Sequence, residues 1–281
     1  MDWQGRRQSS NIEDRRGGGG MARPAGIGGI GLLIVILIGI FFGVDLSPLL
    51  GPGGPVVTES APSGPNEIDD PQEGFVAVVL AETEDVWGAL FRQSNLQYTE
   101  PKLVLFSGQT SSACGFAQSA MGPFYCPNDQ TVYLDTDFFR VMEQQLGARG
   151  DFAKAYVISH EVGHHVQDEL GLLEQVNAAR SRSGERESNA LSVRVELQAD
   201  CYAGIWGRAA QQRLNVTDED VRDALDTAAR IGDDALQRAS QGRVVPDSFT
   251  HGSSQQRQEW FYRGFKSGDP DQCDTFTPAR L

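Results

Sequence analysis

The amino-acid sequence predicts an α+β fold that is mainly helical, with a small sheet and a single transmembrane helix ahead of the folded domain. Three observations lead to this class. Apolar residues recur at helical spacing through most of the chain after residue 73. Two short runs are rich in β-branched and aromatic residues, and one early stretch is apolar and uncharged. The length of 281 residues suits one domain of ordinary size with an anchor and a linker.

The first 72 residues are predicted to anchor the domain. Residues 26–44 carry no charge, and at about 1.5 Å per residue they nearly match the roughly 30 Å hydrocarbon core of a lipid bilayer. Arginines outnumber acidic residues in residues 1–25, which predicts a cytoplasmic tail and a single-pass protein of the cell (inner) membrane. A cleaved signal peptide is the alternative, but no small-x-small cleavage site follows. Residues 45–72, rich in Gly, Pro and Ser, predict a linker to an extracytoplasmic domain.

Within the predicted domain, residues 73–281, apolar spacing and turn residues mark the elements in order. Helices are expected over residues 75–92, 135–146, 151–171, 185–214, 217–238 and 253–266, and strands over residues 102–106 and 131–134. Asp151 is the expected N-cap of the third helix. Residues 107–127, with several Gly, Ser and Cys, are expected to form a loop at the rim of a site.

The third helix carries the most informative stretch, which reads H-E-x-x-H from His160 to His164. Residues i and i+4 of a helix share a face, so His160 and His164 can offer two imidazoles to one metal ion. Glu161 can then act as a base on water. A solvated helix face that binds no metal is the alternative, but the flanking residues are apolar. His165 is one step round the helix, which predicts a supporting or surface role rather than ligation.

A third metal ligand is predicted on the helix over residues 185–214. Glu196 and Asp200 share a face there at spacing i, i+4. Two histidines and one glutamate are a common ligand set for catalytic zinc, and Asp200 is placed to accept the second ring N–H of a ligand histidine. An acidic helix face paired with Arg194 or Arg208 is the alternative.

The remaining histidine and the four cysteines complete the candidate residues. His251 either stabilises a developing oxyanion or has a structural role at the start of the last helix. All four cysteines follow the apolar run, which indicates two disulfides in an oxidising compartment. Of the three possible connectivities we favour Cys114–Cys126 as a local link and Cys201–Cys273 as a link from the C-terminal tail to the helix of Glu196. Zinc ligation by cysteine is disfavoured because no C-x-x-C occurs.

Several segments together resemble a known family. They are Met1-Asp2-Trp3, Gly122 to Pro127, Val132 to Asp135, His160 to His165, Glu196 to Gly204, and His251-Gly252 with Gln256-Arg257 and Trp260-Phe261. H-E-x-x-H with a downstream E-x-x-x-D looks like the thermolysin-like gluzincins. Almost the whole chain is similar to a family of bacterial, membrane-anchored proteins described as neutral zinc metallopeptidases.

This resemblance implies a zincin-like fold with one Zn²⁺ per chain. It implies His160, His164 and Glu196 as the metal ligands and Glu161 as the base. In zincins, a strand at the edge of the cleft aligns an extended peptide. By analogy, residues 131–135 form either that strand or a plain core strand.

Charge narrows the choice of partners. The net charge of −14 leaves no basic surface for phosphates, so the sequence predicts no nucleic-acid partner. The predicted function is zinc-dependent hydrolysis of peptide or protein substrates at a membrane, with contact to the lipid bilayer through residues 26–44. The alternative is a non-catalytic, zinc-stabilised module that binds polypeptides for quality control. The sequence specifies no oligomeric state.

Overall fold

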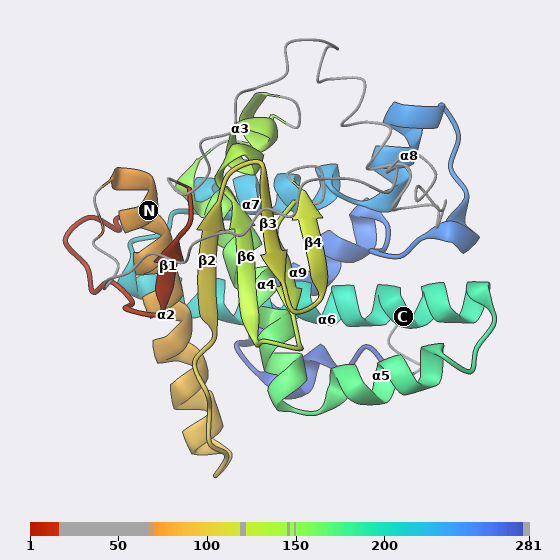
Figure 1. Ribbon diagram of the computed structural model, residues 1–281, viewed down its shortest axis with the longest axis horizontal. Coiled ribbons are helices and arrows are strands. Elements are labelled where there is room, and N and C mark those ends of the chain that lie inside the picture. The colour runs from red at the N-terminus through yellow and green to blue at the C-terminus, as the bar shows by residue number, and fades with distance from the viewer. Residues whose placement is uncertain (17–67, 69, 119–121, 145–146, 149, 278–281) are drawn as a thin grey trace.

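A computed structural model describes residues 1–16, 68, 70–118, 122–144, 147–148 and 150–277 (Figure 1). The strands are β1 (Ile12–Asp14), β2 (Lys102–Phe106), β3 (Gln109–Ser112), β4 (Gly115–Gln118), β5 (Phe124–Cys126) and β6 (Thr131–Asp135). The helices are α2 (Pro71–Gln93), α3 (Thr136–Gln144), α4 (Asp151–Glu169), α5 (Leu172–Arg180), α6 (Glu185–Arg213), α7 (Asp218–Arg230), α8 (Asp233–Gln241) and α9 (Ser254–Ser267), with short 3-10 turns η3 (Pro246–Ser248) and η4 (Pro270–Cys273). The described part is thus mainly helical with small sheets, as the sequence predicts.

The larger sheet has four strands in the order β1-β2-β6-β5. Strands β1, β2 and β6 run parallel, and β5 is antiparallel to β6. Every residue of β6 is buried, and this strand has a neighbouring strand on each side. Residues 131–135 are therefore an inner strand, and β5 and β1 are the edge strands, so of the two interpretations of residues 131–135 only the core strand agrees with the structure.

The helices pack behind the sheet. Helix α4 contacts β5 and β6 on one side and α2, α6 and α7 on the other (Figure 1). The motif helix is consequently surrounded, and Phe152, Tyr156, Ile158 and Val162 along it are fully buried. The apolar spacing that predicts this helix therefore reflects contacts on several sides rather than one amphipathic face.

Two glycines allow α6 and α9 to pack with their backbones in contact. A Cβ added to Gly264 on α9 would lie 1.9 Å from the carbonyl oxygen of Cys201 on α6. A Cβ added to Gly204 on α6 would lie 2.0 Å from the carbonyl oxygen of Phe261 on α9. Neither position accepts a larger residue, so the two glycines fix the distance between these helices.

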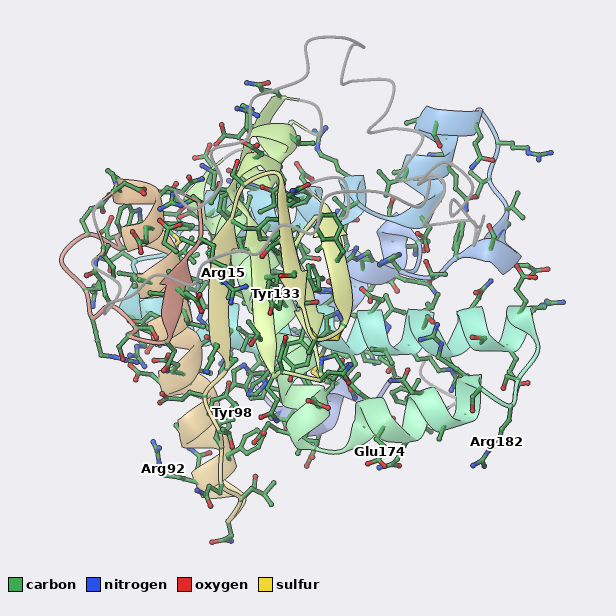
Figure 2. The ribbon with its side chains drawn as sticks, viewed as in Figure 1. Arg15, Arg92, Tyr98, Tyr133, Glu174 and Arg182 are labelled. Carbon is green, nitrogen blue, oxygen red and sulfur yellow. A yellow bond between two sulfur atoms is a disulfide. The ribbon has the colours of Figure 1, made fainter. Side chains whose placement is uncertain are left out.

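Residues 1–16 pack onto the domain, contrary to the predicted separate tail. Strand β1 pairs with β2, and Trp3 donates a hydrogen bond from Nε1 to Asp151 Oδ2, 2.9 Å away, at the start of α4. Arg16 Nη2 lies 2.5 Å from Asp14 Oδ2 and 2.5 Å from Asp70 Oδ2. The folded domain therefore includes residues 1–16 and does not begin at residue 73. Figure 2 shows a further contact of this segment, where Arg15 lies over the ring of Tyr133 on β6, 6.0 Å from its centroid.

The predicted anchor, residues 26–44, lies outside the described residues, as does most of the predicted linker. None of the helices that the structure describes combines the length and the apolar composition required to cross a membrane. Contact with a bilayer through residues 26–44 stays a prediction.

Helix α5 and strand β1 lie where no helix or strand is predicted, and two further stretches differ from their predicted secondary structure. The single helix expected over residues 217–238 is two helices, α7 and α8, separated at Gly232. A Cβ at Gly232 would lie 2.4 Å from the backbone nitrogen of Ser254, the first residue of α9. Glycine at this position therefore allows the start of α9 to pack against the turn between α7 and α8. The loop expected over residues 107–127 contains the β3–β4 hairpin and β5. Gly150, and not Asp151, is the N-cap of α4.

The structure joins Cys114 to Cys126 and Cys201 to Cys273, which are the two pairings that the sequence analysis favours. The first disulfide links the β3–β4 hairpin region to β5. The second links α6 to η4 and so holds the C-terminal tail against the helix that carries Glu196.

Candidate metal centre

A cleft of about 510 Å³ opens where α4, α6, β5 and the loop before α9 meet. His160, Glu161 and His164 reach it from α4, Glu196 from α6, and His251 from the loop. The H-E-x-x-H spacing places the first three on the cleft side of one helix. The remaining wall is largely apolar and includes Phe124, Phe138, Val141, Val157, Ile231 and Leu236.

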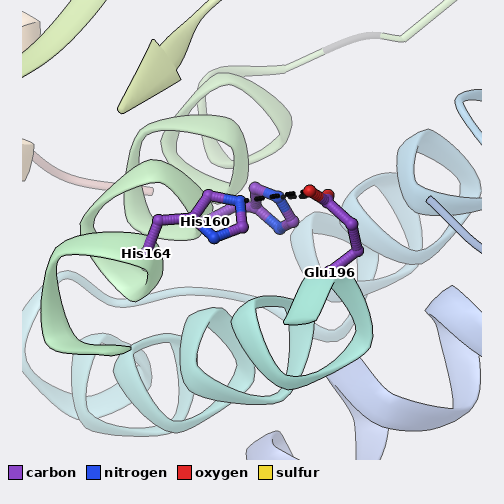
Figure 3. A group of neighbouring side chains, drawn as sticks. All are labelled: His160, His164 and Glu196. Atoms are coloured by element: carbon purple, nitrogen blue, oxygen red, sulfur yellow. Dashed lines mark hydrogen bonds and ion pairs between the residues drawn. The ribbon is translucent and has the colours of Figure 1, made fainter. Parts of the chain in front are cut away.

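His160, His164 and Glu196 converge on one point (Figure 3). One ligand atom from each residue lies within 4.8 Å of the others. His160 Nε2 is 3.2 Å from Glu196 Oε2, and His164 Nε2 is 3.5 Å from Glu196 Oε1. The two imidazole rings are nearly perpendicular, with centroids 4.8 Å apart. The structure thus brings together the three residues predicted as metal ligands.

His160 is supported from behind by Asp200. Its Nδ1 lies 2.9 Å from Asp200 Oδ1, so Nε2 faces the metal position. Asp200 also accepts hydrogen bonds from Tyr156 Oη at 2.5 Å and from Arg257 Nε at 2.8 Å. Asp200 is fully buried. Burial alone raises the pKa of Asp200, but Arg257 and then His160 outweigh it and hold that pKa below its ordinary value.

Charge around His160 suits a cation. Burial lowers the pKa of His160, but Asp200 and Glu196 outweigh that effect and raise it to about 10. The pocket therefore holds a positive charge on this ring, which a divalent ion can replace with release of a proton. Burial raises the pKa of Glu196 as well, but His251, His164 and His160 hold it well below its ordinary value.

His164 is supported by Gln167, a residue that the sequence analysis does not identify. His164 Nδ1 lies 2.9 Å from Gln167 Oε1, one helical turn away on α4. The spacing i, i+3 is a signal in principle. It is weak, however, because glutamine on a helix is usually solvated. Arg257 and Tyr156 are also missed, since they reach Asp200 from α9 and α4.

Glu161 faces the same cleft and is 8% exposed. Burial raises the pKa of Glu161 above the ordinary value for a glutamate, although His160 and His164 oppose the shift. A carboxylate with a raised pKa binds a proton more strongly than an ordinary glutamate does, which is a property that a general base can use.

His251 borders the cleft on a loop fixed by a buried aspartate. Asp233 Oδ2 accepts hydrogen bonds from the backbone N–H groups of Thr250, His251 and Gly252 at 2.7, 2.7 and 3.0 Å. His251 Nδ1 lies 3.5 Å from Asp233 Oδ1. Burial lowers the pKa of His251, but Glu196 and Asp233 outweigh it and raise that pKa above its ordinary value. The His251 ring therefore keeps its positive charge to a higher pH than an ordinary histidine does.

His165 points away from this centre. It is fully buried, and its Nε2 lies 2.7 Å from the carbonyl oxygen of Thr99 while its Nδ1 lies 3.1 Å from Tyr125 Oη. The ring connects α4 to the segment before β2 and to β5, and the expectation of a surface position is wrong.

The residues present fit zinc. Two imidazole nitrogens and one carboxylate oxygen form a ligand set of catalytic zinc, which keeps one position open. The ligand atoms converge within a distance that one ion can span, and they face a cleft large enough for a substrate. Each histidine has a hydrogen-bond acceptor on its other nitrogen, as metal-binding histidines generally have.

Comparison with known proteins agrees with this centre. The family model described as "Putative neutral zinc metallopeptidase" matches residues 1–276. Uncharacterized protein YpfJ of Escherichia coli is 52% identical over 284 residues, which cover 98% of this chain and 99% of that relative. Uncharacterized protein Rv2575 of Mycobacterium tuberculosis is 45% identical over 218 residues, 74% of this chain and 73% of the relative. No solved structure matches the chain at a significant level. The family match spans strand β1, the helices that carry His160, His164 and Glu196, and the disulfide-linked tail, so the chain belongs to this family of putative neutral zinc metallopeptidases.

Proposed function

We propose that the protein is a zinc-dependent peptidase that hydrolyses peptide bonds in the cleft between α4 and α6. The observation that carries the proposal is the convergence of His160, His164 and Glu196 beside Glu161, within one partly apolar cleft. When bound there, zinc lowers the pKa of water and polarises a carbonyl group.

Glu161 moves the proton in this proposal. Its carboxylate accepts a proton from the attacking water and later donates that proton to the leaving amine nitrogen. The raised pKa of Glu161 favours the first half of this transfer, because the carboxylate then binds a proton more strongly than an ordinary glutamate does.

His251 donates a hydrogen bond to the oxyanion that develops on the scissile carbonyl. Three observations support this role: the ring borders the cleft, its loop is held by Asp233, and its pKa is raised. A fixed donor aimed at developing charge needs little reorganisation during the reaction.

The substrate lies in an extended form along β5. This strand is at the edge of the sheet, and its Phe124 and Tyr125 line the cleft together with His160. An exposed strand edge can pair with a peptide backbone whatever its sequence, while the apolar wall selects side chains. The expected substrate is therefore an unfolded or extended polypeptide with an apolar side chain near the cleaved bond. The two disulfides support activity in an oxidising compartment outside the cytoplasm.

The test compares the full-length chain with its Glu161→Gln variant on a mixed peptide library, with zinc content measured in both. Glutamine keeps the shape of Glu161 but cannot accept the proton. We expect zinc in both proteins and cleavage at least about 100-fold slower in the variant, the loss typical of a missing general base. Equal cleavage by the two proteins would contradict the assigned mechanism. Zinc without cleavage in either would contradict the peptidase and favour a polypeptide-binding module.

A further inference from the structure

The two histidine ligands are supported by different chemistry. Asp200, a carboxylate, accepts from His160 Nδ1, whereas Gln167, a neutral amide, accepts from His164 Nδ1. A carboxylate accepts through either oxygen. An amide supports a metal ligand only when its oxygen, and not its nitrogen, faces the ring. The orientation of the Gln167 amide therefore decides whether His164 presents Nε2 to a metal.

The contacts of Gln167 fix that orientation. Its Nε2 donates to the carbonyl oxygen of Val195 at 2.8 Å and to Gln198 Oε1 at 3.0 Å. Both neighbours are acceptors. A rotated Gln167 amide would place its oxygen against two acceptor oxygens and its nitrogen against the ring. Because Gln167 is fully buried, no water replaces the lost hydrogen bonds and the rotated form is costly.

A second amide fixes the first. Gln198 Oε1 faces Gln167 because Gln198 Nε2 donates to the carbonyl oxygen of Cys273 at 3.0 Å. A backbone carbonyl can only accept, so it sets the direction of Gln198. The disulfide to Cys201 holds Cys273, and Thr275 donates from Oγ1 to the carbonyl oxygen of Arg194 at 2.7 Å. The carbonyl oxygen of Cys273, which accepts from Gln198, is therefore held against α6, the helix that carries Glu196.

We propose that Gln167 and Gln198 form a two-amide relay that positions His164 as a metal ligand, with its direction set by two backbone carbonyl groups, that of Val195 on α6 and that of Cys273 in the C-terminal tail. Gln167 and Gln198 touch no substrate; they are positioning residues that act through His164. The inference rests on the proposed metal centre and adds to it a function for the tail, which is to set the affinity for the metal.

The test measures zinc affinity in the full-length protein by competition with a chromophoric chelator. Gln167→Leu keeps the approximate volume and removes the acceptor, so the zinc dissociation constant should rise about 10- to 100-fold, as it does when such supporting contacts are lost. Gln198→Leu removes one of the two acceptors that orient Gln167 and leaves the carbonyl group of Val195, so the rise should be at the low end of that range. Gln175→Leu, an exposed residue on α5, is the matched control and should leave the constant unchanged.

A spectroscopic reading separates positioning from general damage. In metal-free protein with ¹⁵N-labelled histidine, the wild-type His164 should be protonated at Nδ1 when neutral. Gln167→Leu should show a mixture of the two tautomers, and Gln198→Leu should show the same change to a smaller extent. Wild-type zinc affinity and tautomer in Gln167→Leu would overturn the relay and leave the metal centre intact. Gln198→Leu gives the same decision if Gln167→Leu does not fold. A wild-type protein that binds no zinc would overturn the metal centre and the relay together.

Discussion

Asp200 joins the metal centre to the buried core. Its two carboxylate oxygens receive hydrogen bonds from Tyr156, Arg257 and the ring of His160, and none of these groups reaches solvent freely. The position of His160 therefore depends on a buried ion pair between α6 and α9. Removing one partner of such a pair is costly because the other charge stays buried.

We expect Asp200→Asn to lower the free energy of unfolding by about 3–5 kcal/mol at neutral pH, since it leaves Arg257 without a counter-charge. The folded pKa of Asp200 is lower than its ordinary value of 3.8. The ionised carboxylate therefore stabilises the fold above that value, and the stabilisation is lost as the pH falls through the lower, folded pKa. Urea unfolding at pH 7 and at a series of pH values from about 5 down to about 2 measures both effects.

The variant should show a flatter dependence of stability on pH in that acidic range than the wild type. Asp226→Asn, at an exposed position of α7, is the control and should change stability by less than about 0.5 kcal/mol. A wild-type pH profile in Asp200→Asn would show that this carboxylate is not the stabilising group.

At the scale of residues, helical spacing in the sequence identifies several residues of the site. His160, His164, Glu196 and Asp200 are all found from i, i+4 pairs, because one helix face is readable from sequence alone. Gln167 and Arg257 are not, since their roles depend on contacts between α4, α6 and α9. Nothing in a single sequence states which helices pack against one another.

At the scale of elements, the contact of α6 with α9 sets the depth of the cleft. Helix α6 carries Glu196 and Asp200, and α9 carries Arg257, so the distance between the helices determines whether the ion pair forms. The backbone contact at Gly204 and Gly264 gives this distance little tolerance. The sequence predicts both helices but not where they cross. Gly204 and Gly264 lie within their helices without interrupting them, so neither marks the contact in the sequence.

Gly264→Ala should push α6 and α9 apart, because the added methyl group would lie 1.9 Å from the carbonyl oxygen of Cys201. Overpacking of this kind costs about 1–3 kcal/mol or more, and we expect a matching fall in the free energy of unfolding. Gly88→Ala on α2 is the matched control. There the nearest atom is the flexible Nη1 of Arg92 at 3.3 Å, and alanine should stabilise the helix by up to about 1 kcal/mol. Equal effects of the two changes would contradict the close packing.

At the scale of the whole molecule, residues 1–16 and the domain that carries the candidate metal centre are one folded body. Strand β1 lies at the edge of the sheet, and Trp3 reaches the start of the motif helix. Parts that pack together lie on the same side of any membrane. The expectation of a cytoplasmic tail with an extracytoplasmic domain conflicts with this packing. The sequence conceals the contact because a three-residue strand has no clear pattern and its partner is some 90 residues away.

We therefore expect a cysteine introduced at Gln4 and one introduced at Gln255, both exposed positions, to react with a membrane-impermeant thiol reagent from the same side in spheroplasts. The four natural cysteines are in disulfides and should not react. Labelling of the Gln255 position in intact spheroplasts, with labelling of the Gln4 position only after lysis, would show that β1 is absent from the sheet in the cell.

The metal content of the purified full-length chain tests the central claim most directly. Native mass spectrometry should find one zinc ion per wild-type chain and one per Glu161→Gln chain, and none in Glu196→Ala at the same free zinc concentration. Well-folded wild-type protein that takes up no metal when zinc is supplied would contradict the account, since the pairing of His160 with His164 would then have another purpose.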